Sequence, residues 1–150
     1  MIRDAMVWNE DLNIPIYPRA EDLVLLMNSL VDVIGRGSAG ILYNFGKQLA
    51  EKYYANMNIP QDLGPDVTFK NILSSMMFSD WFTKMEIEKG DEIVVTLQNV
   101  FELNANEESC NFIRGFLAGL SSSIYNRTYI CKESRNPEGV CVFTLIERGL

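Results

Sequence analysis

The chain has no histidine among its 150 residues. Catalysis by Ser–His–Asp triads or Cys–His pairs is therefore excluded, because both need an imidazole as the base. Zinc sites that use histidine are excluded for the same reason. Any acid–base chemistry would have to come from carboxylate, lysine, tyrosine or cysteine side chains.

Positive charge is also scarce. Lysine and arginine number 13 against 20 aspartates and glutamates, which gives a formal net charge of -7. This balance disfavours nucleic acid, which needs a basic footprint, and a polybasic membrane anchor. The first residues lack a signal-peptide pattern, and apolar runs such as Leu23–Met27 are too short to span a bilayer. We therefore expect a cytoplasmic protein that binds neither nucleic acid nor membrane.

The order of the predicted elements indicates an α+β fold in one domain, residues 1–150. Apolar residues at helical spacing predict four helices: Glu21–Ile34, Ala39–Asn56, Val67–Phe78 and Asn111–Ile124. Runs of β-branched and aromatic residues predict four strands: Phe82–Glu88, Glu92–Leu103, Thr128–Glu133 and Val140–Ile146. We also expect an edge hairpin from Ala5–Trp8 and Asn13–Tyr17, and helix caps at Ser38 and Asp66. The architecture is then an antiparallel β-sheet packed against an N-terminal helical layer.

Glycine is informative in two places. The run Gly35–Gly40 matches the GxGxxG dinucleotide pattern, but that pattern requires a preceding strand, and the residues before it follow a helical stripe. We interpret the run as a glycine-rich corner between helices. Gly115 and Gly119 lie one turn apart on the last predicted helix, where small residues let a neighbouring backbone approach closely.

The three cysteines of the chain, Cys110, Cys131 and Cys141, all lie in its last third. One is expected at a helix start and two on strands joined by the turn Ser134–Gly139, so the three thiols can converge on one point. Glu133 would share a face with Cys131, because side chains alternate along a strand. We predict a zinc-type site between a helix start and a β-hairpin, held by these four residues. The alternatives are water or an incoming group as fourth ligand, thiols buried as small hydrophobes, and a disulfide.

Aromatic residues gather around the predicted sheet and its last helix. Phe112 and Phe116 recur four residues apart on the helix, and Trp81 and Tyr129 flank strands. Such residues form the ordinary core of a domain, and they also line apolar pockets for small aromatic or lipid-like ligands. These four are the candidate ligand-binding residues.

The last part of the chain, about Met85–Glu147, resembles the 4-vinyl reductase domain. The resemblance rests on two strands that carry Cys131 and Cys141, and on the helix run before them: Cys110-Asn111-Phe112-Ile113-Arg114-Gly115-Phe116-Leu117-Ala118-Gly119. That domain belongs to a ligand-binding superfamily that includes nitric-oxide sensors and Golgi transport-particle subunits. Within it, the chain looks most like the stand-alone archaeal hydrocarbon-binding members.

The resemblance implies a zinc site with Cys110 and Cys141 as its first and last ligands. Cys131 falls where an acidic ligand is usual, and Ser134 stands near the place of a further cysteine. Glu133 is therefore the expected fourth ligand.

The resemblance also implies a pocket beside the metal, with Tyr129 among its aromatic residues. We expect a non-enzymatic sensor or carrier of a small hydrophobic ligand, with structural zinc, in a homodimer. One alternative is an interaction module that dimerises like the transport-particle subunits. Another is a reductase-associated protein, which the domain's name suggests but for which the sequence offers no nucleotide site.

Overall fold

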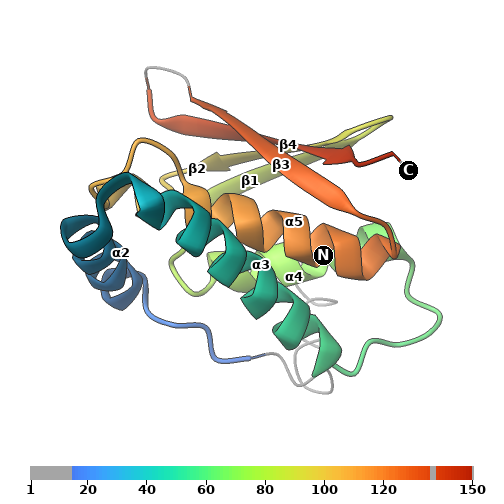
Figure 1. Ribbon diagram of the computed structural model, residues 1–150. Coiled ribbons are helices and arrows are strands. Elements are labelled where there is room, and N and C mark those ends of the chain that lie inside the picture. The colour runs from blue at the N-terminus through green and yellow to red at the C-terminus, as the bar shows by residue number, and fades with distance from the viewer. Residues whose placement is uncertain (1–14, 136–137, 150) are drawn as a thin grey trace.

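Figure 1 shows the computed structural model, which describes residues 15–135 and 138–149. Its helices are α2 (Ala20–Ile34), α3 (Ser38–Ala55), α4 (Pro65–Met77) and α5 (Asn111–Tyr125), with 3-10 turns η1 (Gly35–Gly37) and η2 (Phe101–Asn104). Its strands are β1 (Lys84–Lys89), β2 (Ile93–Gln98), β3 (Tyr129–Arg135) and β4 (Val140–Glu147). The predicted α+β fold, with an antiparallel sheet against helices, is confirmed.

The four strands form one antiparallel sheet in the order β1-β2-β4-β3. Strands β1 and β2 form one hairpin, and β3 and β4 form a second. The two hairpins are joined by the pairing of β2 with β4. Burial alternates along β2 and β4, as expected for a sheet with one face on the core. Cys141, Phe143 and Leu145 are the buried residues of β4.

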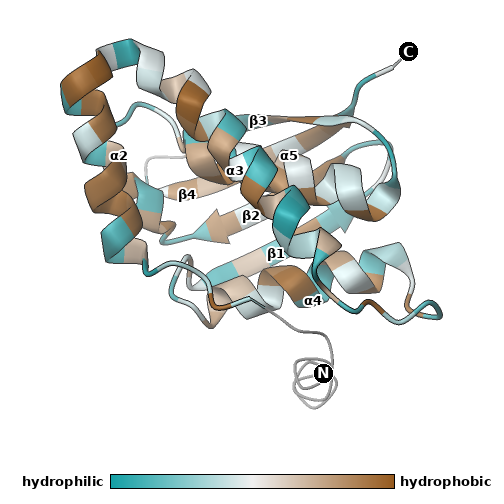
Figure 2. Cartoon of the chain, turned by 60° about the horizontal axis from the view of Figure 1, so that its bottom comes forward, coloured by the Kyte–Doolittle hydropathy of each residue, from teal (hydrophilic) through white to brown (hydrophobic). Residues whose placement is uncertain are grey.

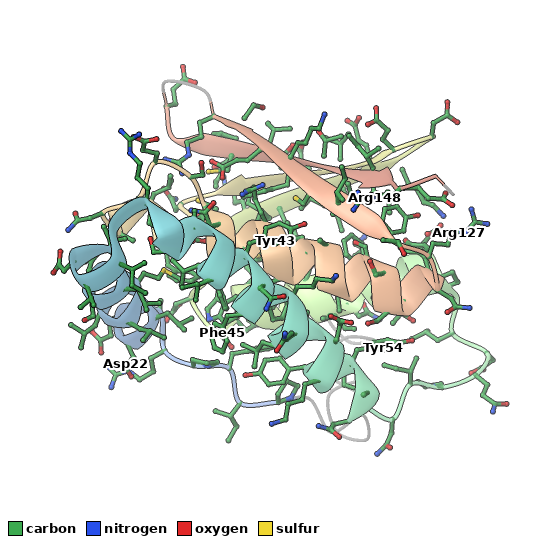
Figure 3. The ribbon with its side chains drawn as sticks, in the orientation of Figure 1. Asp22, Tyr43, Phe45, Tyr54, Arg127 and Arg148 are labelled. Carbon is green, nitrogen blue, oxygen red and sulfur yellow. The ribbon has the colours of Figure 1, made fainter. Side chains whose placement is uncertain are left out.

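Helix α5 lies against the inner face of the sheet. Helix α3 packs across the side of α5 that faces away from the sheet (Figure 1). Helix α5 is buried around most of its circumference, as a helix covered on two sides must be. Figure 3 shows Tyr43 on the side of α3 nearer the sheet and Phe45 on the opposite side. The Tyr43 ring lies beneath the Arg114 guanidinium of α5 at 5.1 Å.

The contact between α3 and α5 depends on glycines from both helices. A Cβ atom added at Gly115 or Gly119 would fall within 3.0 Å of α3 backbone at Tyr43 and Lys47, and one at Gly46 would meet α5 backbone as closely. Real Cβ atoms are almost never so close to backbone. The predicted close approach at Gly115 and Gly119 is therefore confirmed, with α3 as the neighbour.

The glycine corner is also confirmed, because η1 (Gly35–Gly37) joins α2 directly to α3. The two predicted helix caps are wrong. Ser38 is the first residue of α3 and makes no capping bond, since η1 leads straight into the helix without the extended residue that a cap requires. Asp66 lies inside the first turn of α4, where it accepts a hydrogen bond from the Tyr125 hydroxyl at 2.6 Å and pairs with Lys89 at 3.0 Å.

The predicted strand Glu92–Leu103 is too long. Strand β2 ends at Gln98, because Asn99 adopts a left-handed conformation with φ of 55° that interrupts the strand. The chain then forms η2, which carries Glu102 to the start of α5. Of the predicted edge hairpin, Ala5–Trp8 lies outside the described residues, and residues 15–17 form no strand.

Helix α2 carries an uncovered apolar face, visible as brown ribbon in Figure 2. Its exposed apolar residues are Leu25, Leu26, Val33 and Ile34. The stretch Ala20–Ala55 is apolar enough to cross a membrane by length and composition alone, with a mean hydropathy of 1.2 in its best window. A single stretch of this kind is a weak indication, and here the chain changes helix type at η1 and packs α3 on α5.

Candidate functional site

Three of the four predicted metal ligands come together. The thiol sulfurs of Cys110 and Cys141 and a carboxylate oxygen of Glu133 lie within 4.8 Å of one another. Cys110 occupies the N-cap position of α5, Glu133 lies on β3, and Cys141 lies on β4. Both thiols are fully buried, so the group closes the junction between the helix start and the hairpin.

Glu133 connects the two parts of this junction. Its Oε1 accepts a hydrogen bond from the backbone N–H of Cys110 at 2.6 Å, which satisfies a donor at the helix start. Its Oε2 accepts from Arg135 Nε at 2.5 Å. Arg135 also donates from Nη2 to the Cys110 sulfur at 3.5 Å. One cation therefore already lies against two of the three ligand residues.

The two clustered thiols behave as a pair. A hydrogen bond with Cys141, followed by burial, raises the pKa of Cys110 well above the ordinary thiol range. The same hydrogen bond lowers the pKa of Cys141. The thiol of Cys110 therefore donates to the sulfur of Cys141, and Cys141 is the first of the two to become a thiolate. Thiolates are the form of cysteine that binds metals.

Cys131 lies apart from this group. Cys131 pairs with Leu145 across the hairpin, whereas Cys141 pairs with Arg135. Cys141 therefore lies four residues before the partner of Cys131 on β4. At about 3.3 Å per residue, that offset is roughly 13 Å along the strand, too far for two sulfurs that each bind zinc at about 2.3 Å. Burial raises the pKa of Cys131, which favours an inert thiol. The geometry does not bring Cys131 to the other three predicted ligands.

All three cysteines are free, buried thiols, so the structure contains no disulfide among them. The disulfide alternative therefore has no support in the described residues.

Three of the four candidate ligand-binding aromatics form one buried cluster. The Trp81 ring lies 5.5 Å from that of Phe112 and 5.3 Å from that of Phe116, both edge-on. Phe101 and Tyr17 also contact Trp81, at 5.5 Å and 5.3 Å. Edge-to-face contacts at these distances are the favourable geometry for aromatic rings. Cys110 is the N-cap of α5 and Phe112 is the second residue of that helix, so the same helix start connects the metal-ligand group to the cluster.

Tyr129 belongs to a different region. Its ring contacts Tyr125 at 6.0 Å, near the end of α5 that is far from Cys110, and Tyr125 contacts Phe69. Four surface pockets have volumes of about 320 to 430 Å³, and none of them is lined by Tyr129 or by the Trp81 cluster. The cluster is filled by its own rings.

Sequence reasoning missed Glu102, the acidic residue that holds the start of α5. Its two carboxyl oxygens accept hydrogen bonds from the backbone N–H groups of Phe112 at 2.8 Å and Ile113 at 2.9 Å. Burial, together with the nearby Glu107 carboxylate, raises the pKa of Glu102 well above its ordinary value. The sequence signal is an acidic residue inside the otherwise apolar run Val100–Leu103. Burying a carboxylate in such a segment is costly unless hydrogen-bond partners compensate it.

No protein-family model matches the chain, and no curated protein matches it. Solved structures do. The phenol-responsive sensory domain of the transcription activator PoxR, determined with phenol, has a TM-score of 0.67 and 13% identity over 97% of this chain and 90% of that one. A vinyl-4-reductase family protein from Methanocaldococcus jannaschii has a TM-score of 0.60 and 19% identity over 99% and 90%.

A third similar structure is trafficking protein particle complex subunit 3 from Naegleria fowleri, covalently bound to palmitic acid. Its TM-score is 0.57, with 12% identity over 87% of this chain and 95% of that one. At these identities the similarity shows the fold.

Proposed function

We propose that this chain is a non-enzymatic domain that senses or carries a small hydrophobic ligand and is held together by a structural zinc ion. The observation that carries the proposal is the convergence of Cys110, Glu133 and Cys141 at the start of α5, the helix that also supplies Phe112 and Phe116 to the Trp81 cluster. One helix, α5, contributes both to the ligand group and to the cluster, so the state of one can affect the other. Buried free thiols also suit the reducing cytoplasm.

The donor set fits zinc in chemistry and in charge. Two thiolates and one carboxylate are ordinary zinc ligands, which lie about 2.0–2.3 Å from the ion. Fully deprotonated, the three ligands carry three negative charges, which a divalent ion and the adjacent Arg135 would balance. Metal binding would release the thiol protons of both Cys110 and Cys141, including the one that they share in a hydrogen bond. The fourth position would be taken by water or an incoming group, since Cys131 is too distant.

Zinc is tested by metal analysis of the protein purified without added chelator. We expect one zinc per chain, and we expect Cys110→Ser and Cys141→Ser to lose the metal and to melt several degrees lower. Cys131→Ser is the matched control, because it changes a thiol that is equally buried but outside the ligand group. Zinc-free wild-type protein, or equal loss in Cys131→Ser, would show that the site is something else.

The neighbouring structures support the ligand part of the proposal, because one was determined with phenol and another with palmitic acid. Both are small or slender molecules of the kind that bind in pockets lined by aromatic residues, and the rings around Trp81 would have to separate to admit one here. Native mass spectrometry of the purified chain is expected to show an added mass of about a few hundred daltons, as for a typical pocket ligand. A chain that binds neither a copurified molecule nor any member of a panel of phenols and fatty acids would contradict this.

A second candidate function is assembly through a homodimer, which the uncovered apolar face of α2 favours. Contiguous exposed apolar surface commonly marks an interaction site. We expect a dimer by light scattering, and we expect Val33→Asp to give a monomer, because Val33 is 84% exposed and the charge would enter the interface. Val67→Asp, at an exposed apolar position on α4, is the control and should remain dimeric. A monomeric wild type would exclude this function for the isolated chain.

A further inference from the structure

The segment Pro15–Arg19 precedes α2 and has no regular secondary structure. Tyr17 is its one buried residue, 6% exposed, whereas its neighbour Ile16 is 98% exposed. A single side chain from an irregular segment therefore enters the core. It contacts the ring of Trp81 at 5.3 Å and, edge-on, the ring of Tyr53 at 5.6 Å.

The packing site that receives this ring, here called the Tyr17 socket, also forms a hydrogen bond with the hydroxyl. Tyr17 Oη lies 2.8 Å from Ser75 Oγ. The hydroxyl proton of Ser75 is already donated to the carbonyl oxygen of Ile72 at 2.6 Å. A serine hydroxyl has one proton, so Tyr17 must be the donor in this bond. Burial raises the pKa of Tyr17 to about 12, which keeps that proton in place.

The second polar group of the aromatic cluster is held by the same segment. Trp81 Nε1 donates to the backbone carbonyl of Pro18 at 3.0 Å. Trp81 is fully buried, so its indole N–H needs a hydrogen-bond acceptor inside the protein, and Pro18 of this segment supplies it. The segment thus supplies a phenol ring, a hydroxyl donor and a carbonyl acceptor to one apolar socket. An apolar socket with a few convergent polar groups is the usual form of a small-molecule site.

We propose that the Tyr17 socket is a binding site for small phenols, and that Tyr17 is its internal occupant, displaced when such a ligand binds. This rests on the proposed ligand-binding function and adds the ligand class and the device that controls access. A phenol would place its ring against Trp81 and Tyr53 and donate its hydroxyl to Ser75. Binding would release Pro15–Arg19 from the cluster, which gives the occupied state a different surface at the start of α2.

The test uses 4-methylphenol, because this molecule is the tyrosine side chain with a hydrogen in place of the backbone. In Tyr17→Ala the socket is vacated, and we expect 4-methylphenol to bind at least tenfold more tightly than to wild type by calorimetry. It should also raise the melting temperature of the variant toward that of wild type, since a ligand that binds only the folded state stabilises it. Toluene, which lacks the hydroxyl, should bind at least tenfold more weakly than 4-methylphenol.

Tyr125→Ala is the matched control, because Tyr125 also joins ring contacts and donates its hydroxyl, but to Asp66 outside the cluster. Neither compound should rescue it. Pro18→Gly keeps Tyr17 and the residues that contact it. Glycine gives the released segment more conformational freedom, which makes it less favourable to hold the segment in place. This variant should bind 4-methylphenol with intermediate affinity, and it decides the question if Tyr17→Ala does not fold.

Equal affinity of wild type and both socket variants for 4-methylphenol, rescue of Tyr125→Ala, or no binding to either socket variant would overturn the inference. A copurified apolar molecule on wild type together with any of those results would overturn the inference alone and leave the proposed function standing.

Discussion

Replacing Gly115 with alanine is expected to lower the free energy of unfolding by about 3 kcal/mol, the upper part of the usual range for overpacking. The new Cβ would fall within 3.0 Å of the carbonyl group and Cα of Tyr43, all of them backbone atoms of α3. A side chain could rotate away, but helix backbone cannot, so α3 and α5 must separate. The shift opens gaps in a close-packed core, whose lost contacts add to the cost. Urea denaturation measures this loss of unfolding free energy as a lower midpoint at an unchanged dependence of the free energy on urea concentration.

Gly40→Ala is the control for this prediction. Gly40 also lies within a helix, and a Cβ added there meets nothing within 4 Å. Alanine should therefore stabilise the chain by roughly 0.5–1 kcal/mol, through helix propensity and reduced entropy of the unfolded state. Opposite signs for one substitution at two helical glycines isolate the effect of the α3–α5 contact. If Gly115→Ala were as stable as Gly40→Ala, the two helices could not be packed as described.

Periodicity predicted the fold because apolar spacing follows directly from burial. The predicted apolar stripe of α2 consists of Leu23, Leu26, Met27, Leu30 and Ile34. Leu23 and Met27 are buried in the structure, whereas Leu26 and Ile34 at the edge of the stripe are exposed. The alternation in β2 likewise reflects a sheet with one face on the core. Boundaries were less predictable, because they depend on single backbone conformations such as that of Asn99, which a periodic pattern does not contain.

The metal-ligand group shows where pattern reasoning stops. That Cys131 and Glu133 share a strand face followed from alternation alone and agrees with the hairpin register. Which of them lies near Cys141 depends on the pairing register of the hairpin, which alternation does not give. Glu133 pairs with Phe143, two residues from Cys141, whereas Cys131 pairs with Leu145, four residues from it. The register therefore brings Glu133 close to Cys141 and leaves Cys131 apart.

Tyr17 and Glu102 could not be predicted as site residues, because their partners are distant in sequence. Tyr17 bonds to Ser75, 58 residues away, and Glu102 bonds to Phe112 and Ile113, 10 and 11 residues away across an irregular loop. Composition indicates that such residues are unusual in an apolar setting. It does not indicate which groups they meet, since tertiary packing alone sets those contacts.

Replacing Glu102 with alanine is expected to lower the free energy of unfolding by about 3 kcal/mol, because two buried backbone donors at the start of α5 would lose their acceptor. The N–H groups of Phe112 and Ile113 belong to the first turn of a buried helix and have no intrahelical partner. Since Cys110 directly precedes that turn, we also expect weaker retention of any metal at the neighbouring thiols. Urea denaturation measures the first effect and metal analysis the second.

Stability should also depend on pH through this residue. The Glu107 carboxyl is a neighbour of Glu102, and its Oε2 is buried without a hydrogen-bond partner among the described residues. Burial and this neighbour raise the pKa of Glu102 well above 4.5, its ordinary value. Folding therefore favours the protonated form. The stability gained from that proton is fully present below the unfolded pKa and is lost as the pH rises through the folded pKa.

Glu107→Gln is the variant that tests the sign of this effect. The new amide can donate to a charged Glu102 carboxylate, while both backbone bonds to Glu102 are kept. We expect the variant to be more stable than wild type at neutral pH and to lose less stability over the pH interval between the unfolded and the raised folded pKa of Glu102. Glu102→Ala should be less stable than wild type throughout and should lack this pH dependence. A wild type whose stability rises with pH over that interval would show that Glu102 folds as a charged carboxylate, which its burial opposes.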